Sequence, residues 1–376
     1  MIPSKLSNVK WFNLFFFVAS PIGAIVGTTW LLKNGGPHWA TWILALLMWF
    51  SSGLTVTAGY HRLFSHRSYQ ANGFIRFLYI LFGSAALEGS ARWWCLGHRY
   101  HHRYVDTQDD PYGINKGFWY AHIGWLLTKD HDRMVGYGQI KDLEKDPLIR
   151  IQDRYYVFFM VIMGFLFPIG IASLWGDPWG GFFVAGLGRI VLNHHLTFCI
   201  NSVCHTIGKQ TYSDKHSAKD SWIAAVLTYG EGYHNFHHEF QSDYRNGIKG
   251  YQWDPTKWLI RTLNWMGMTR NLHIVSRERI LRAKLQMDQK RFAASAHVAI
   301  ERTEEFLASA REQLQKTHDR FLALRREYQR VRAEKIDFMA ECAEKLKSDL
   351  REAQKEFKKA MTAWRLLMKA PSLITN

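Results

Sequence analysis

The sequence predicts an all-α integral membrane protein with four transmembrane helices, a cytosolic helical cap holding a histidine-rich dimetal site, and a long C-terminal helical tail. Three observations support this fold class. Four apolar segments are each close to the ~20 residues that cross a bilayer core. Three histidine motifs lie beyond the ends of these segments. After about residue 276 the chain has no glycine, and its apolar residues recur at three- and four-residue steps.

The four apolar segments are placed at about residues 11–32, 39–58, 155–175 and 179–199. The mildly negative mean hydropathy does not oppose these spans, because the long polar tail dilutes it. No signal peptide is expected, since the first apolar run leads on to more spans and has no small-residue cleavage site. The four cysteines form no CxxC pair, and we expect reduced, structural thiols.

The distribution of charge predicts the orientation in the membrane. Residues 60–154 contain 13 Lys and Arg, whereas the turns at 33–38 and 175–178 contain only Lys33. The positive-inside rule places the long segment in the cytoplasm. With an even number of spans, all three histidine motifs and both termini then lie on the cytoplasmic side. Residues 73–88 are apolar but too short to cross, and we expect a short interfacial or re-entrant helix pair.

The histidine motifs are HRLFSH from His61, HRYHH from His98 and HNFHH from His234, with His205 between the second and third. Positions i, i+3 and i+4 share one face of an α-helix, so each HxxHH motif can point at a common centre. His61 and His66 are five residues apart, and we expect one of them at a helix end. Eight to ten imidazoles exceed the roughly six ligands of one ion and suit two metals side by side.

The ligand type restricts the chemistry. Structural zinc sites use thiolates and close at four ligands, whereas these cysteines are not clustered. A histidine-rich, largely carboxylate-free binuclear centre suggests iron and oxygen chemistry on unactivated carbon. The apolar spans would supply a dry channel for an alkyl chain. The histidines alone do not separate desaturation from hydroxylation. A non-enzymatic metal-binding protein such as a transporter would need ligands within the spans.

The tail, Ser276–Asn376, holds 23 Lys and Arg against 15 Asp and Glu, half of the net charge of +16. Its apolar pattern predicts a long helix or helical hairpin with a break near Lys335. That pattern comprises Leu307, Ala310, Leu314, Phe321, Leu324, Tyr328 and Val331. A solvated helix docked on the catalytic domain, a coiled-coil oligomer, and attraction of anionic lipid or acidic partners all fit. Nucleic-acid binding is disfavoured because no nucleic-acid motif accompanies the charge. We therefore divide the chain into a membrane domain, 1–275, and a basic extension, 276–376.

Five colinear stretches over roughly residues 10–275 resemble the membrane fatty acyl desaturases, specifically the acyl-CoA Δ9 (stearoyl-CoA) type. They are GYHRLFSHRSY, EGSARWWCLGHRYHHRYVDTQDDPY, GFWYAHIGWLL, TFCINSVCHTIG and YGEGYHNFHHEFQSDYRNGIKGYQWDPTKWLI. The resemblance implies a four-span, mushroom-like helical fold. It also implies a reaction in which two iron ions, O2 and two external electrons convert a saturated long-chain acyl-CoA into a cis-unsaturated one. An alkyl-chain hydroxylase, or a desaturase of acyl-lipid or acyl-carrier protein, remains the alternative.

By motif match, the resemblance implies ten metal-site residues. They are His61, His66, His98, His101, His102, His205, His234, His237 and His238, with Asn201 acting through a water. We expect the substrate channel to include Trp93, Trp94, Thr197, Phe198 and Tyr233. Hydrogen-bond partners for the ligating rings are expected among Asp106, Asp110, Glu231, Glu239 and Asp243, which could instead pair with Arg99, Arg103 and Arg245.

The remaining histidines are given no metal role. His122 is expected to pack in the cap, and His194 and His195 to be structural. Loop or surface positions are expected for His38, His131, His216, His273, His297 and His318.

Two positions depart from the animal enzymes of this type. Leu96 and Gly97 replace an arginine and an aspartate, which puts a CoA contact there in doubt, and Phe198 replaces a tryptophan. The local sequence is closer to the fungal form, yet no HPGG haem-binding stretch of cytochrome b5 occurs. Electrons are therefore expected from a separate cytochrome b5- or ferredoxin-like donor, which the basic tail and cap could dock.

Overall fold

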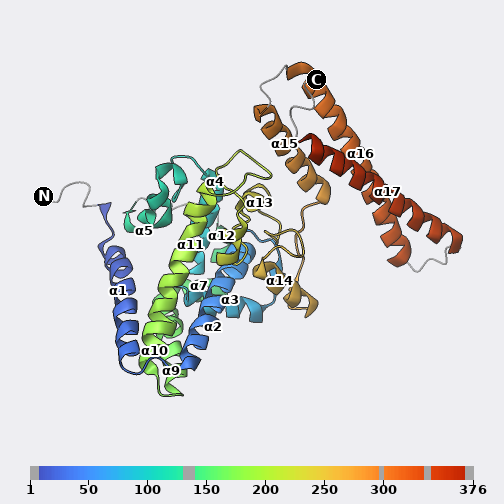
Figure 1. Cartoon of the computed structure of the whole chain (residues 1–376). Helices are drawn as coiled ribbons and strands as arrows, with labels where there is room; N and C mark the ends of the chain where they lie inside the picture. The colour runs from blue at the N-terminus through green and yellow to red at the C-terminus, as the bar shows by residue number, and fades with distance from the viewer. Residues whose placement is uncertain (1–7, 130–139, 296–299, 334–339, 369–376) are drawn as a thin grey trace. The chain divides into compact units, whose positions relative to one another are not determined.

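The structure, a computed structural model, describes residues 8–129, 140–295, 300–333 and 340–368. Their contacts divide the chain into two compact units. The first comprises Met1–Gln210 and Lys215–Ile274, and the second comprises Thr211–Asp214 and Val275–Asn376. Each unit is helical (Figure 1). The longer segment of the second unit starts at Val275, one residue before the glycine-free, basic tail that the sequence marks from Ser276.

Four helices of the first unit are long and apolar enough to cross a membrane: Trp11–Lys33, Trp39–Ser65, Tyr156–Ser173 and Pro178–Thr206. Their elements are α1 (Trp11–Lys33), α2 (Trp39–Thr55), η2 (Val56–Ser65), α8 (Tyr156–Val161), η7 (Ile162–Leu166), α9 (Phe167–Ser173), α10 (Pro178–Gly180), η8 (Gly181–Gly188) and α11 (Arg189–Thr206). Large apolar side chains stay exposed along them, such as Phe12, Ile25 and Leu47. Outward-facing apolar surface of this length is suited to lipid. The predicted all-α, four-span membrane fold is confirmed.

The two short turns between spans meet at one end of the bundle. Asp177, in the second turn, accepts hydrogen bonds from the backbone N–H of His38 (2.9 Å) and from the Thr41 hydroxyl (2.6 Å). The Trp175 indole N–H donates to the Thr41 hydroxyl as well (2.9 Å). The segments that carry the histidine motifs consequently lie at the opposite ends of the spans, on a common side, as the charge pattern predicts.

The cap is built from the segments that leave the spans at that common side. Its elements are β1 (Gln70–Ala71), α3 (Gly73–Ser84), α4 (Ala91–Tyr104), η3 (Ile114–Lys116), η4 (Tyr120–Gly124), α5 (Trp125–Leu127), α6 (Lys141–Glu144), α7 (Pro147–Arg154), α12 (Trp222–Leu227), α13 (His234–Glu239), α14 (Pro255–Trp265) and β2 (Thr269–Arg270). The strands β1 and β2 pair antiparallel, with Gln70 opposite Arg270, and join the start of the cap to its end.

Two sequence-based expectations about this region need correction. Residues 73–88 form one helix, α3, followed by a turn, rather than a helix pair. A second helix does not form because the four residues after Ser84 include Leu87, which has a φ of 58°. The second span is also longer than expected and continues to Ser65, because the helix widens into the π-helix η2 instead of ending near residue 58.

The second unit contains α15 (Arg277–Ser295), α16 (Ile300–Ala333) and α17 (Ala340–Leu367). The helices α16 and α17 pack on one another as the predicted helical hairpin. The core of the second unit holds Leu285 of α15, Leu314 of α16 and Trp364 of α17, which are each at most 2% exposed. Ion pairs between Arg320 and Glu356 and between Arg326 and Glu278 join its helices.

Candidate metal centre and apolar cavity

Nine histidines gather into two groups in which one ring nitrogen from each residue lies within 4.8 Å of all the others. The first group contains five residues, His61, His66, His98, His102 and His237. The second group contains four residues, His101, His205, His234 and His238. These nine are the histidines that the sequence motifs select. Chain segments up to 177 residues apart are thus brought to one place, and no histidine of the predicted set is left outside.

The helical period decides which histidine joins which group. On α4, His98 and His102 are four residues apart and belong to the first group, whereas His101 belongs to the second. On α13, His234 and His238 are again four apart and share the second group. Residues i and i+4 lie about 40° apart around a helix, whereas i+3 and i+4 lie about 100° apart. Each HxxHH motif therefore serves both groups, rather than one common centre as the sequence suggested.

A π-helix accommodates the five-residue spacing of the first motif. His61 lies within η2, and His66 is the residue that follows its last turn. The backbone N–H of His66 donates to the carbonyl oxygen of His61 at 3.1 Å, the i→i+5 bond of a π-helix. This geometry places both rings in the first group, with centroids 4.8 Å apart. The expectation that one of the two lies at a helix end is confirmed for His66.

The histidine nitrogens approach one another closely, and several of the rings are buried where the charged form is disfavoured. His61 and His237 nitrogens lie 3.0 Å apart, and those of His66 and His98 lie 2.8 Å apart. Burial first, and then the neighbouring histidines, lower the pKa of His66, His98 and His237 well below the usual value. Neutral imidazoles with converging lone pairs are good ligands for a transition-metal ion. The residues present therefore fit two metal ions, one in each group.

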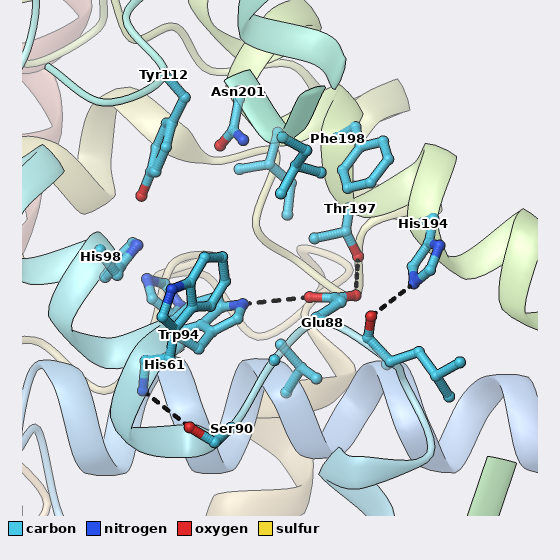
Figure 2. Close-up of a pocket in the computed structure, with 18 of the residues that line it drawn as sticks. His61, Glu88, Ser90, Trp94, His98, Tyr112, His194, Thr197, Phe198 and Asn201 are labelled. Atoms are coloured by element: carbon cyan, nitrogen blue, oxygen red, sulfur yellow. Dashed lines mark hydrogen bonds between the residues drawn. The ribbon is translucent and has the colours of Figure 1, made fainter. Parts of the chain in front are cut away.

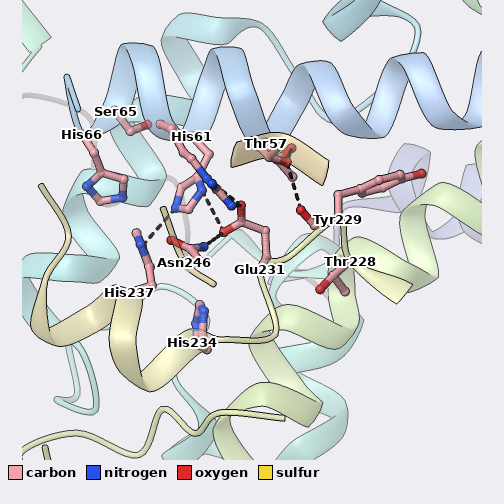
Figure 3. Close-up of polar contacts among 12 residues, drawn as sticks. Thr57, His61, Ser65, His66, Thr228, Tyr229, Glu231, His234, His237 and Asn246 are labelled. Carbon is pink, nitrogen blue, oxygen red and sulfur yellow. Dashed lines mark hydrogen bonds and ion pairs between the residues drawn. The ribbon is translucent and has the colours of Figure 1, made fainter. Parts of the chain in front are cut away.

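Acidic and hydroxyl side chains hold the outward-facing nitrogens of several rings. Figure 3 shows Glu231 beside His61, where Oε2 lies 2.9 Å from Nδ1. The Asp110 carboxylate lies 2.9 Å from Nδ1 of His101. Such contacts fix the orientation of a ligating ring and its tautomer.

The other three acidic residues behave differently from one another. Asp106 acts through Ser217, whose hydroxyl lies 2.6 Å from Asp106 and 2.6 Å from Nδ1 of His205. Asp243 instead forms an ion pair with Arg245 at 2.7 Å, the alternative role considered from the sequence. Glu239, half-buried at the end of α13, has no hydrogen bond or ion pair assigned to it among the described residues.

Glu231 also belongs to a buried charge network behind the first group. Arg62 donates to Glu231 (2.9 Å) and lies 3.0 Å from Asp254, and all three side chains are at most 3% exposed. Asn246 donates a further hydrogen bond to Glu231 at 2.7 Å (Figure 3). Burial raises the pKa of Glu231, but His61 and Arg62 outweigh it and hold that pKa at about 2. The carboxylate therefore stays charged and keeps the His61 ring in place.

A cavity of about 670 Å³ opens onto both histidine groups. His61 and His98 of the first group and His101 and His234 of the second lie on its wall. Most of the remaining wall is apolar and comes from the membrane spans and α4. It includes Phe12, Phe16, Phe17, Val56, Trp93, Trp94, Val157, Met160, Phe165, Thr197, Phe198 and Asn201. Its size and lining are typical of a site for a small apolar ligand.

Four of the five residues expected along a substrate channel therefore line this cavity. Figure 2 shows Trp94, Thr197, Phe198 and Asn201 around it. Tyr233 is not among the lining residues; its ring packs against Gly247 instead. Asn201 lies one turn before His205 on α11 and faces the same cavity.

Glu88 is a cavity residue that the sequence reasoning missed. It accepts hydrogen bonds from Thr197 (2.9 Å), Asn193 (2.9 Å) and the Trp94 indole (3.2 Å), as Figure 2 partly shows. Burial raises the pKa of Glu88 to about 7, although these three donors oppose the rise. A carboxyl group ten residues before His98, just after an apolar run, was the available signal.

The histidines given no metal role fall into three classes. His122, buried in the cap, contacts Ser202 (3.0 Å) and the exposed His195 (3.1 Å), and His194 lies 2.9 Å from the carbonyl oxygen of Ala86. His38 and His273 are partly or fully exposed, as expected. His216 lies in a loop as expected, although its side chain is only 9% exposed. The loop or surface position expected for His318 is wrong, since it lies on α16 and is 5% exposed. His131 and His297 lie outside the residues whose side chains are described.

Comparison with known proteins gives a consistent assignment. The sequence profile of the family described as "Fatty acid desaturase" matches residues 37–273. A "Probable acyl-CoA desaturase" of Schizosaccharomyces pombe is 42% identical over 75% of this chain and 58% of its own length. "Acyl-CoA desaturase 1" of Saccharomyces cerevisiae is 41% identical over 76% of this chain and 56% of its own length. The "sn-1 stearoyl-lipid 9-desaturase" of Anabaena variabilis is 32% identical over 73% of this chain and 98% of its own length. The chain thus spans little more than half the length of the two fungal relatives.

Proposed function

This chain belongs to the fatty acid desaturase family, and from that premise we propose that it is an O2-dependent acyl-CoA desaturase forming a cis double bond at Δ9. In the reaction, two adjacent CH2 groups lose one hydrogen each. With two electrons and two protons from outside, O2 is reduced to two water molecules. The observation that carries the proposal is the apolar cavity whose wall includes histidines of both groups.

Two iron ions are proposed as the metals, held by the five and the four histidines, with Asn201 acting through a water on the second. When bound, such a pair supplies the O2 activation needed to break unactivated C–H bonds. The protein's part is to hold neutral imidazoles at converging positions. Glu231 and Asp110 orient two of the rings, and the low pKa of Glu231 keeps its carboxylate charged in that role.

The cavity wall positions the acyl chain and excludes water. Phe16, Phe17 and Phe165 supply apolar surface from the spans, while Trp94 lies against His98 with ring centroids 4.9 Å apart. A chain in this cavity must pass beside the histidine groups, so its depth of entry determines which carbons face the metals. The hydrogen-bonded group of Glu88, Trp94 and Thr197 holds the wall rigid at this point.

We place the active site and both termini on the cytoplasmic side. The support is the common end at which the cap segments lie and the excess of Lys and Arg in them. Reactivity of single cysteines introduced at exposed Lys249 and at Lys33 towards a membrane-impermeant maleimide in intact cells tests this. Labelling at residue 33 and protection at residue 249 are expected; the reverse pattern overturns the orientation.

The electron donor is proposed to be a separate acidic protein of the cytochrome b5 or ferredoxin type. Exposed cations of α17 support this, namely Lys345, Arg351, Lys355, Lys358, Lys359 and Arg365. Replacing Lys355, Lys358 and Lys359 by Gln is expected to raise the KM for the donor and to weaken the dependence of turnover on salt. The control is Lys33→Gln, in the short turn between the first two spans. An unchanged KM in the triple variant would count against docking on α17.

Two alternatives differ in the product or in the head group. An alkyl-chain hydroxylase would yield an alcohol, and the name of the Anabaena relative shows that a family member is assigned to acyl-lipid. The stretches WDPTKW and DTQDDPY favour desaturation by resemblance to the family. Purified protein supplied with a donor, O2 and stearoyl groups on CoA, on carrier protein or in lipid discriminates between these alternatives. We expect an alkene from the CoA ester.

Gas chromatography of fatty acids from a host lacking its own desaturase tests the proposed function. Wild-type protein is expected to produce a Δ9 monounsaturated acid, and His98→Ala to produce none. His273→Ala, which changes an exposed histidine of the same unit, is the matched control and should retain activity. If wild-type protein yields no new unsaturated acid while O2 and a donor are present, the assignment fails.

A further inference from the structure

His216 is a buried histidine outside the nine, beside the second group. It lies in the loop between α11 and α12, and its side chain is 9% exposed. Neither of its ring nitrogens has a hydrogen-bond partner among the described residues. A buried ring with both nitrogens unsatisfied is costly and indicates an unseen partner such as an ion or a water.

The ring of His216 is as near to His238 as the rings of His101 and His205 are. Its centroid lies 5.1 Å from that of His238. The corresponding distances from His238 to His101 and to His205 are 5.1 Å and 5.3 Å. His216 nevertheless does not belong to the set whose donor atoms converge within 4.8 Å. Its ring therefore flanks the group from the side of His238.

The backbone that follows this ring is held by hydrogen bonds. Gln210 donates to the carbonyl oxygen of His216 at 2.6 Å. The next residue, Ser217, binds Asp106 through both its backbone N–H and its hydroxyl, each at 2.6 Å, and the same hydroxyl contacts His205. The position of His216 thus follows from contacts that also orient His205, a residue of the second group.

The two groups differ in the number of imidazoles they offer. The first has five, and the second has four. We propose that His216 supplies a fifth imidazole to the metal ion of the second group, as an additional ligand beyond the nine that the motifs indicate. This inference rests on the proposed two-metal centre. A second site with only the four histidines would have its coordination completed by water alone, whereas this chain would also supply His216.

The test measures metal binding rather than turnover. Purified wild-type protein and His216 variants are loaded with Fe2+ or with Co2+ as a spectroscopic probe, and the metal per chain and its rate of loss to a chelator are determined. We expect His216→Ala to release one of the two ions about 10–100-fold faster, and the other at the wild-type rate. The visible Co2+ bands should become more intense, because a lower coordination number strengthens them.

A second variant separates ligation from packing. His216→Phe keeps a ring against His238 but has no nitrogen, so it should behave like His216→Ala. If His216→Phe retains both ions with the wild-type rate and spectrum, the residue only packs and the inference is overturned. His273→Ala is the matched control. If wild-type protein itself binds no pair of ions, the proposed centre fails. If wild-type protein binds two ions and the His216 variants hold them equally well, only the proposed role of His216 as a ligand is refuted.

Discussion

At the residue scale, the environment of each carboxylate determines its role near the metal centre. Glu231 and Glu88 are both buried, but Glu231 faces His61 and Arg62 whereas Glu88 faces only neutral donors. The pKa of Glu231 is accordingly held at about 2 and that of Glu88 is raised to about 7. One acidic side chain is therefore a permanent charge, and the other changes charge near neutral pH.

Replacing Glu231 by Gln removes the negative charge that pairs with Arg62 and lies beside His61. We expect the variant to lose metal from the first group and to be destabilised by about 3–5 kcal/mol, because Arg62 keeps only one buried carboxylate partner, Asp254. Iron content and the thermal unfolding midpoint measure the two effects. Glu144→Gln, which removes an exposed ion pair with Arg92 in the same unit, is the control and should change neither. Full metal content in Glu231→Gln would contradict the proposed orienting role.

The raised pKa of Glu88 makes stability depend on pH. Its neutral form is favoured in the folded state, so its contribution is complete below the unfolded value of about 4.5 and declines as the pH rises to about 7 and beyond. Glu88→Gln is therefore expected to be more stable than wild type at pH 8, by up to about 3 kcal/mol, and similar to it at pH 4.5. The free energy of unfolding of both proteins, measured across this pH range, tests the expectation. If it changes with pH in the same way in both, the expectation is contradicted.

At the element scale, η2 brings the two histidines of the first motif next to His98 and His102 of α4. A glycine, Gly59, permits the approach of this helix to α3, since a Cβ there would lie 2.7 Å from Cβ of Tyr79. The widened helix is also why His61 and His66 enter one group although five residues separate them. The sequence could not predict this, because π-helical turns have no reliable residue signature and are stabilised by the surrounding packing.

Gly59→Ala should force η2 and α3 apart. We expect a loss of about 1–3 kcal/mol in the free energy of unfolding and a weaker hold on the first metal. Gly73→Ala, at the start of α3, is the matched control, because an added Cβ there meets nothing within 4 Å. Unfolding by denaturant and metal retention are the measurements. Equal stability of the two variants would show that η2 tolerates displacement.

Sequence reasoning predicted the four spans and eight of the nine histidines because each carries a local signal, apolar length in one case and fixed spacing in the other. His205 lies outside the three motifs and is assigned by resemblance to the family. Sequence reasoning did not predict how the histidines divide between groups, since that depends on the facing directions of α4 and α13. It also missed Glu88, and it expected His216 in a loop or at the surface without foreseeing that its side chain is buried. Both side chains become buried only when distant segments meet, and a single sequence does not contain that information.

At the scale of the whole molecule, the two units have separate cores. The apolar residues of the tail that could have joined two copies are largely used inside its own hairpin, as for Leu307 and Leu314, which are 2% and 0% exposed. Phe321 stacks on Phe357 within the same unit. The second unit therefore has a packed core of its own, which predicts that it behaves as an independent helical domain.

Trp364→Ala tests that independence. Trp364 is 2% exposed, and its removal is expected to cost the second unit about 3–5 kcal/mol. The membrane unit should retain its metal and its own unfolding midpoint. Calorimetry of the full chain, combined with metal analysis, measures both, and Leu366→Ala, at an exposed position of the same helix, is the control. A simultaneous loss of metal would contradict the separation of the two units.

The central claim is that nine imidazoles from three motifs and one further helix enclose a pair of metal ions beside an apolar cavity. Anomalous diffraction at the iron absorption edge from crystals of the iron-loaded protein tests this most directly. We predict two peaks per chain, one within the five-histidine group and one within the four-histidine group. A single peak, or peaks away from these histidines, would contradict the account.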